Sequence, residues 1–364
     1  MKIAHVEAVP LRMPFDHAGA SRDLTAGGWP ALDFCLVKVT TDTGITGWGD
    51  AFAYHCREAV TAAVEHMVKP AVLGMDARDV AGISHRLQQK FHLFGRYGVT
   101  LFALSGLDIA LWDIAGKAAG LPLAQMFGGS ADRTLPAYSS LFILRDKEAV
   151  IADVQRSLAE GYRYIKLHEI GAVEVGAARE AAGDDIPIMV DVNCPWTPEQ
   201  AKRMALELDQ FDLHWLEEPV FPPEDFASLA RIRGETGVPI AAGENWCTSF
   251  QFAQALAAGA VDYTQPSVTK VGGITEFRKV AALSEAAGVQ VMPHSPYFGP
   301  GFLATLQLAA AMPNPGLVER FYINPEASLY GDWITPVDGA FRVPDGPGLG
   351  LDPDPAVIRE YRVA

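Results

Sequence analysis

The sequence predicts an α/β protein in which an N-terminal α+β region precedes a modified TIM barrel of the (β/α)7β type. Beyond about residue 131, short strand-like runs alternate with helical stretches. Polar residues that end these runs recur every 25 to 27 residues in two series, one from Lys166 to Glu244 and one from Ser267 to Glu319. This repeat indicates a parallel sheet with helical crossovers. With residues 134–140 as the first strand there are eight runs, the number that closes such a barrel.

The region before the barrel has a different order of strand-like and helical patterns. Residues 3–12 and 34–40 alternate as strands do, and a turn at 41–44 leads into a further strand-like stretch. Helical patterns then follow at 57–69, 77–91 and 99–119.

These patterns divide the chain into three parts. We expect an N-terminal α+β domain over 1–130 and a barrel over 131–325. The remaining segment, 326–364, is rich in Pro and Gly and has no further strand–helix unit, so it is expected to return across both domains.

Composition limits the classes of function. The chain has 364 residues, 49% of them hydrophobic, and a formal net charge of −15. This charge argues against nucleic acid as a partner, because phosphate binding needs a basic face. Apolar runs fall far short of the roughly 18 residues of a membrane span, so no membrane partner is expected. Four cysteines without C-x-x-C spacing, and a start without a signal-peptide pattern, indicate the reducing cytoplasm.

Three carboxylates end consecutive strand runs: Asp191, Glu217 and Glu244. At the mouth of a barrel they would converge, and three buried negative charges need a neutralising cation. Oxygen ligands suit a hard ion, and a site that keeps positions open for water or substrate indicates one Mg²⁺. Capping of the following helix is the alternative for each residue alone, but three carboxylates at matched positions favour a metal site.

The runs that carry these carboxylates, VDVN, WLEEP and AGEN, resemble the mandelate racemase and muconate-lactonising branch of the enolase superfamily. The stretches at 103–129 (ALSGLDIALWDIAGKAAGLPLAQMFGG) and 270–273 (KVGG) resemble the same branch. The resemblance implies that the first domain caps the barrel. It also implies that Mg²⁺ binds the three carboxylates together with a substrate carboxylate, and that removal of the α-proton gives an enediolate.

The same resemblance gives roles to further residues. It places Asn193 beside the metal and makes Glu218 an acid behind it. Lys166 and His168 lie two apart on one strand, so both side chains point to the mouth of the barrel. Relatives of the mandelate racemase type carry K-x-K here, whereas this chain has K-x-H.

The resemblance makes His168 the base and Lys166 its positive neighbour, which also faces Glu218. An imidazole has a reference pKa of about 6.5, so His168 would be a base at neutral pH with an acid limb within about a unit or two of that value. A histidine that is hydrogen-bonded for structure alone is the alternative.

His294 ends the seventh strand run and would approach the substrate from the opposite face. The resemblance puts an Asp behind such a histidine, but Ser267 occupies that position, and Lys270 matches a lysine outside the catalytic position. Disabling the Asp behind a serine-protease histidine costs about 10⁴ in rate. His294 is therefore expected to be a weaker base, better suited to acid or electrophile duty. The resemblance implies that Glu319 donates a hydrogen bond to the substrate carboxylate, and neighbouring carboxylates could keep it protonated for this role.

These residues favour dehydration of a sugar acid, which needs one base and one acid. A racemase or epimerase needs competent bases on both faces and is an alternative, as is a lactone cycloisomerase. A binding protein without chemistry is the non-enzymatic alternative, which the retained bases oppose. The loops at 16–30 and 51–57 are expected to be lids whose polar groups fit a polyol, with the candidate lid residues His17, Arg22, Trp29, Tyr54 and His55. The resemblance also implies a homo-oligomer.

Overall fold

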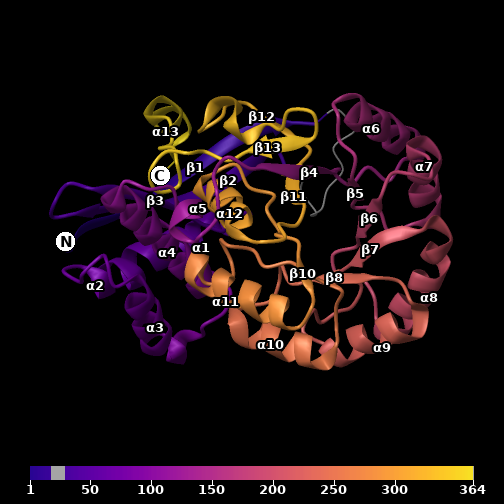
Figure 1. Ribbon diagram of the computed structural model, residues 1–364, viewed down its shortest axis with the longest axis horizontal. Helices are drawn as coiled ribbons and strands as arrows, with labels where there is room; N and C mark the ends of the chain where they lie inside the picture. Colours follow the sequence, from indigo (N-terminus) through magenta and orange to yellow (C-terminus); the bar gives the residue numbers. More distant parts are fainter. Residues whose placement is uncertain (18–28, 364) are drawn as a thin grey trace.

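The computed structural model describes residues 1–17 and 29–363, so Arg22 of the predicted lid lies outside the described residues. Two sheets organise these parts of the chain (Figure 1). The first is antiparallel, in the order β12-β1-β2-β3, with strands β1 (Ile3–Asp16), β2 (Ala31–Thr41), β3 (Thr46–Ala51) and β12 (Asn324–Pro325). β1 and β2 run beyond their predicted ends because they pair from Ile3–Thr41 to Pro14–Ala31.

The second sheet contains eight parallel strands in the order β10-β9-β8-β7-β6-β5-β4-β11. They are β4 (Thr134–Ser140), β5 (Ile165–Leu167), β6 (Ile188–Asp191), β7 (Leu213–Glu217), β8 (Ile240–Ala242), β9 (Tyr263–Thr264), β10 (Gln290–Val291) and β11 (Val318–Phe321). This arrangement confirms the predicted barrel with an N-terminal α+β cap.

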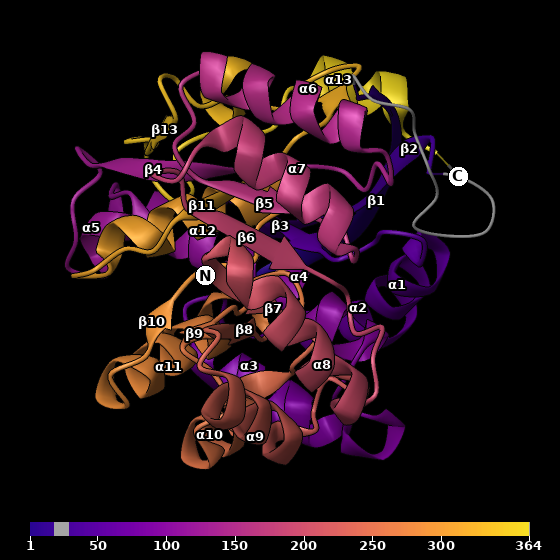
Figure 2. The same ribbon diagram turned by 90° about the vertical axis from the view of Figure 1, so that its right-hand side faces the viewer.

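Helices surround the strands on the outside, as both views show (Figures 1 and 2). They follow the strands in turn: α6 (Lys147–Ala159), α7 (Ala172–Ala182), α8 (Pro198–Leu208), α9 (Phe226–Thr236), α10 (Thr248–Ala258), α11 (Gly273–Ala286) and α12 (Pro300–Ala311). Tyr138, Met189, Trp215, Ala241, Met292 and Leu317 form a buried cluster inside the barrel. The inside of the barrel is therefore filled by packed side chains and is not an open pore.

Side chains complete the contact between the two edge strands of the barrel sheet. The amide of Leu317 donates to Met292 Sδ over 3.2 Å, and the amide of Glu319 donates to Ser295 Oγ over 3.2 Å. The segments that follow β10 and lead into β11 are thereby held together, which brings His294 and Glu319 to one side of the mouth.

The cap contains α1 (Arg57–Ala63), η1 (Val64–Val68), α2 (Lys69–Val72), α3 (Val80–Lys90), η2 (His92–Phe94), α4 (Val99–Ala119) and α5 (Leu123–Met126). The helix predicted at 57–69 continues to Val72 through a π-helical segment. The helix predicted from 77 starts at Val80 instead, because the Asp79 side chain accepts a hydrogen bond from the Gly82 amide and caps it.

α4 has the bounds that the sequence predicted. By length and composition alone it could cross a membrane, but 72% of its apolar 18-residue stretch is buried inside the protein. It lies against β3, where small residues permit a close approach of the two backbones. α4 is the central core helix of the cap.

Substitution of Gly49 tests this contact between β3 and α4. A Cβ on Gly49 would lie 1.8 Å from the carbonyl oxygen of Gly106, so we expect Gly49→Ala to lower the free energy of unfolding by at least about 2 kcal/mol. Urea unfolding measures this change. Gly234→Ala on α9 is the matched control, because nothing lies within 4 Å of its added Cβ. Equal effects of the two substitutions would contradict the close contact.

The C-terminal part of the chain, from β12 onward, contacts both sheets. β12 pairs with β1, and β13 (Ala340–Arg342) pairs antiparallel with β4. Between them lies η4 (Gly331–Ile334). The Pro-rich end also forms a short helix that the sequence did not predict, α13 (Pro355–Tyr361), which begins because Asp354 accepts from the Ala356 amide.

Candidate active site

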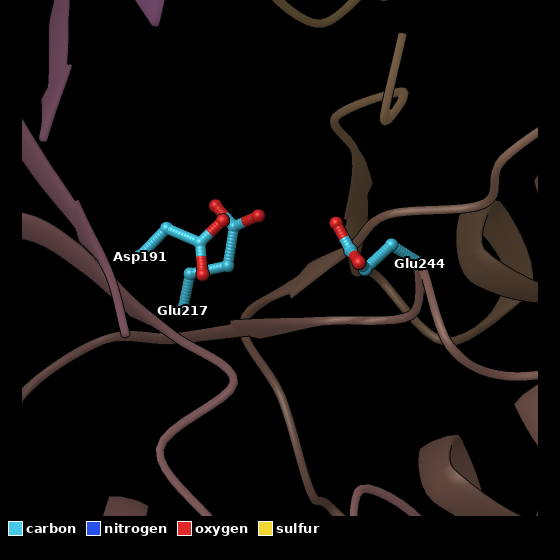
Figure 3. Close-up of side chains that lie close together, drawn as sticks. All are labelled: Asp191, Glu217 and Glu244. Atoms are coloured by element: carbon cyan, nitrogen blue, oxygen red, sulfur yellow. The ribbon is translucent and has the colours of Figure 1, made fainter. Parts of the chain in front are cut away.

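The three predicted metal ligands converge at the C-terminal ends of three neighbouring strands. Asp191 and Glu217 are the last residues of β6 and β7 and lie side by side in the sheet register. Glu244 follows β8 and approaches from the other side (Figure 3). One oxygen from each carboxylate lies within 4.8 Å of the others, close enough to hold a single ion.

Lys166 lies directly behind this cluster and is fully buried. Its Nζ atom lies 3.4 Å from Asp191 Oδ2, 3.1 Å from Glu217 Oε1 and 2.9 Å from Glu319 Oε1. The predicted contact between Lys166 and Glu218 is wrong. Glu218 has a positive φ of 46° just after β7, and its carboxylate accepts from Asn245 Nδ2 over 2.7 Å instead.

The electrostatics of the cluster fit a bound cation. Burial and the charge of Asp191 raise the pKa of Glu217 to about 8, and burial together with Glu244 raises that of Glu218 well above its usual range. One buried lysine does not offset this crowding of carboxylates. An all-oxygen donor set that carries excess negative charge is the environment that a hard divalent ion prefers. Asn193 holds Asp191 in place, since its backbone N–H and its side-chain Nδ2 both donate to Asp191 Oδ1 over 3.0 Å.

The neighbours of His168 decide which of its ring nitrogens carries the proton. Its Nδ1 lies 2.6 Å from the carbonyl oxygen of Leu141, which can only accept, so Nδ1 carries the proton. The other nitrogen, Nε2, therefore faces the carboxylate cluster and lies 3.3 Å from Asp191 Oδ2. Lys166 and His168 reach the same carboxylate oxygen, as expected for residues two apart on one strand.

The pKa of His168 leads to a pH prediction. Burial lowers this pKa, but the hydrogen bond to Asp191 and the charge of Asp191 raise it by more, so it lies above its ordinary value. Protonated imidazole cannot accept an α-proton, so kcat/KM should fall as the pH drops below the raised pKa. A cation on Asp191 opposes this influence, and the midpoint should move back toward about 6.5 as the ion saturates. Values of kcat/KM from about pH 5 to 9 measure this fall at low pH. A kcat/KM that does not change over this range would exclude His168 as the base.

A second histidine lies opposite His168. His294 is buried, and its Nε2 lies 2.5 Å from Glu244 Oε2, while its Nδ1 lies 3.2 Å from the hydroxyl of Tyr297. Ser267 Oγ is also hydrogen-bonded to that hydroxyl, and no hydrogen bond joins Ser267 to the imidazole within the described residues. Lys270, which the sequence placed outside the catalytic position, lies in the same site as the two histidines. Its Nζ donates to Asn245 Oδ1 over 2.9 Å.

Glu319 occupies the predicted place, but its expected protonation is not supported. Burial raises its pKa, yet Lys166 and further hydrogen bonds lower the pKa below the usual value overall. Its Oε1 faces Lys166 and accepts from Ser140 Oγ over 2.8 Å, and its Oε2 accepts from the Ser295 amide over 3.0 Å. Neighbouring cationic groups and donors, which the sequence could not reveal, outweigh the effect of burial and favour an ionised Glu319.

A cavity of about 150 Å³ opens beside these groups. One part of its lining is polar and comes from His168, Asp191, Asn193, Glu244, Lys270, His294 and Glu319. The other part is largely aromatic and comes from Trp29, Phe52, Tyr54 and Phe321, together with Pro296. The cavity therefore offers flat apolar surface on one side and charge on the other.

Two of the predicted lid residues, Trp29 and Tyr54, belong to the aromatic wall. His17 is stacked on Phe142 with ring centroids 4.8 Å apart, and His55 is exposed beside Trp29; neither lines the cavity. The polar lid groups within the described ranges therefore do not support the expected preference for a polyol. His17 is buried, and its two ring nitrogens have no hydrogen-bond partner within the described residues.

Several residues of the site were not predicted. Asn245 bridges Glu218, Glu244 and Lys270, and its position directly after Glu244 was the one available signal. Tyr297, Ser140 and Ser295 gave no signal, because their roles depend on which distant side chains they meet.

The fold and the site together define a capped (β/α) barrel with three carboxylates that could hold a metal ion and a histidine beside them. A family model for the mandelate racemase / muconate lactonizing enzyme N-terminal domain matches residues 7–128, and one described as enolase C-terminal domain-like matches residues 149–357. The chain belongs to the mandelate racemase and muconate-lactonising branch of the enolase superfamily, as its motifs predicted.

Three similar proteins illustrate the range of this branch. The chain is 35% identical to a 3,6-anhydro-alpha-L-galactonate cycloisomerase from Streptomyces coelicolor, over 90% of this chain and 91% of the relative. It is 31% identical to an arabinonate dehydratase from Saccharolobus solfataricus, over 91% of each chain. A crystal structure of a racemase from Streptomyces coelicolor with bound magnesium matches with a TM-score of 0.86 and 34% identity, over 99% of this chain and 100% of that one.

Proposed function

We propose that this chain is a magnesium-dependent enzyme that removes the proton α to the carboxylate of a sugar acid and expels an oxygen substituent from the β-carbon. The observation that carries the proposal is the orientation of His168. Its Nδ1–H is bound to Leu141, and its basic Nε2 faces the cluster of three carboxylates. Relatives named as a dehydratase and a cycloisomerase support the same class of reaction.

Asp191, Glu217 and Glu244 would hold the ion, which when bound supplies positive charge for the substrate carboxylate and for the charge that develops as the proton leaves. Lys166 adds a buried positive charge on the same side. His168 takes the α-proton at Nε2, and the resulting imidazolium can return it to the departing oxygen. The aromatic wall excludes water from the other side of the substrate.

Dehydration is the form of this reaction that the sequence favoured, and the proposal keeps it. If the β-oxygen is a hydroxyl, it leaves as water and the enzyme is a dehydratase. If the β-oxygen belongs to a ring, the same step opens the ring without loss of atoms, and the enzyme is a cycloisomerase. This second candidate is favoured by the cycloisomerase relative and by the flat aromatic wall, which suits a cyclic substrate.

A screen of acid sugars, their lactones and their anhydro forms in heavy water tests the proposal. Deuterium uptake at the α-carbon reports proton removal, and the product mass separates loss of water from ring opening. Inversion without loss or rearrangement would indicate a racemase instead. Absence of α-exchange with every acid, in protein shown to bind Mg²⁺, would contradict the proposal.

The remaining expectations complete the proposal. A cytoplasmic compartment agrees with four free cysteines. A homo-oligomer and the lack of nucleic-acid or membrane partners are proposed on the family and the net charge of −15. Gel filtration with light scattering measures the oligomeric state.

A further inference from the structure

The two histidines of the site are held in different ways. The Nδ1 of His168 meets a carbonyl oxygen, which leaves no choice of tautomer. The Nδ1 of His294 meets the hydroxyl of Tyr297, which can either donate or accept. Ser267, at the position where the family resemblance places an Asp, touches this hydroxyl rather than the histidine.

Tyr297 is firmly placed between these two partners. It lies three residues after His294 in the segment before α12, and it is buried. Its ring crosses that of His294 at 83° with centroids 5.8 Å apart, and it lies near Phe52 and Tyr54 of the cap. The hydroxyl of Tyr54 donates to the carbonyl of Pro296 over 2.6 Å, which ties the segment to the cap.

The directions of the hydrogen bonds follow from counting protons. If Ser267 donates to Tyr297 and Tyr297 donates to His294 Nδ1, then His294 Nε2 carries a proton, which is directed at Glu244 Oε2 only 2.5 Å away. Each hydrogen in this series of hydrogen bonds, from Ser267 to Glu244, then has an acceptor. In the reverse direction, Ser267 Oγ–H would lose its acceptor, because the Tyr297 hydroxyl is the one hydrogen-bond partner of Ser267 Oγ within residues 1–17 and 29–363.

We propose that Tyr297, oriented by Ser267, is a positioning residue that fixes His294 as its Nε2–H tautomer, so that His294 donates a hydrogen bond in the site and is not a second base. Burial raises the pKa of Tyr297, so its hydroxyl keeps the proton that it donates. A neutral donor of this kind can polarise a substrate oxygen, as a neutral imidazole does elsewhere. The kinetic part of this inference rests on the proposed function, in which His168 is the base.

The tautomer can be measured without a substrate. In magnesium-loaded protein with ¹⁵N-labelled histidine, long-range ¹H–¹⁵N NMR should show a protonated Nε2 and an unprotonated Nδ1 for His294, with its signals identified from their loss in His294→Asn. Tyr297→Phe removes the donor and keeps the ring, and it should give a mixture of tautomers. Ser267→Ala leaves all aromatic packing intact and should give a smaller shift in the same direction. A protonated Nδ1 in the native protein, or an unchanged tautomer in both variants, would overturn the proposal.

Kinetics provide the second measurement. Tyr297→Phe should lower kcat by about 10- to 100-fold, the cost of losing an orienting partner. KM and the α-exchange that His168 starts should change by less than about threefold, because His168 is held independently. Tyr330→Phe is the matched control, since Tyr330 is buried outside the cavity lining and should leave all parameters unchanged. An unchanged kcat in Tyr297→Phe would overturn the role. If the native protein exchanges no acid, the proposed function fails, while the NMR result still decides the tautomer.

Discussion

Replacement of Glu217 by glutamine is expected to weaken magnesium binding by at least about 100-fold and to reduce kcat/KM by at least the same factor. Glu217 lies at the end of β7 beside Asp191, and its carboxylate faces the other two ligands (Figure 3). A neutral amide is a poorer ligand for a hard cation and no longer supplies the negative charge that draws the ion into the cluster. Isothermal titration with Mg²⁺ and steady-state rates measure both effects.

Thermal unfolding separates loss of the ion from loss of the fold. Because the pKa of Glu217 is raised to about 8, glutamine resembles the form that this side chain favours without an ion near neutral pH. The chelated variant should therefore unfold close to the temperature of the chelated native protein. Added Mg²⁺ should stabilise the native protein and not the variant. Glu207→Gln, an exposed change on α8, is the matched control. Full activity of Glu217→Gln, or of exhaustively chelated native protein, would contradict the metal site.

Replacement of His168 by alanine is expected to lower α-proton exchange by about 10²- to 10⁴-fold while magnesium stays bound. The imidazole is the group that we propose accepts this proton, and the metal ligands belong to other strands. Exchange into heavy water measures the loss, and titration with Mg²⁺ checks the ion. His85→Ala, on the exposed face of α3, should leave both unchanged.

His294→Ala should behave differently from His168→Ala. Exchange started by His168 should survive, whereas formation of the final product should be impaired, because His294 is proposed to bind a substrate oxygen rather than the α-proton. If His168→Ala keeps exchange and His294→Ala loses it with every substrate, the base lies on the other face of the substrate.

Much of the fold and part of the site could be predicted from the chain alone. The regular spacing from Lys166 to Glu244 reflects the fixed length of a strand and its crossover helix, and it places these residues at equivalent strand ends. The same-face position of Lys166 and His168 follows from the period of a strand. Both arguments need no knowledge of distant contacts, and for that reason they agreed with the structure.

The remaining features depended on contacts between segments far apart in the chain. Glu319 was expected to be neutral, but Lys166, Ser140 and Ser295 come from three other segments to meet its two oxygens. Glu218 was expected to face Lys166, but its positive φ just after the strand turns it toward Asn245. His17 was expected at the mouth, but packing on Phe142 buries it elsewhere.

The sequence by itself determined which strand-end residues stand at the barrel mouth, because periodicity and strand length are local properties of the chain. Only the tertiary structure decided which other groups each of those residues meets there. A histidine becomes a base or a donor according to the partner of its second nitrogen, and that partner is a carbonyl from the end of β4 for His168 and a tyrosine hydroxyl for His294. Hydrogen-bond direction and ionisation are set by groups within a few ångströms, and folding brings these groups together from unrelated parts of the sequence.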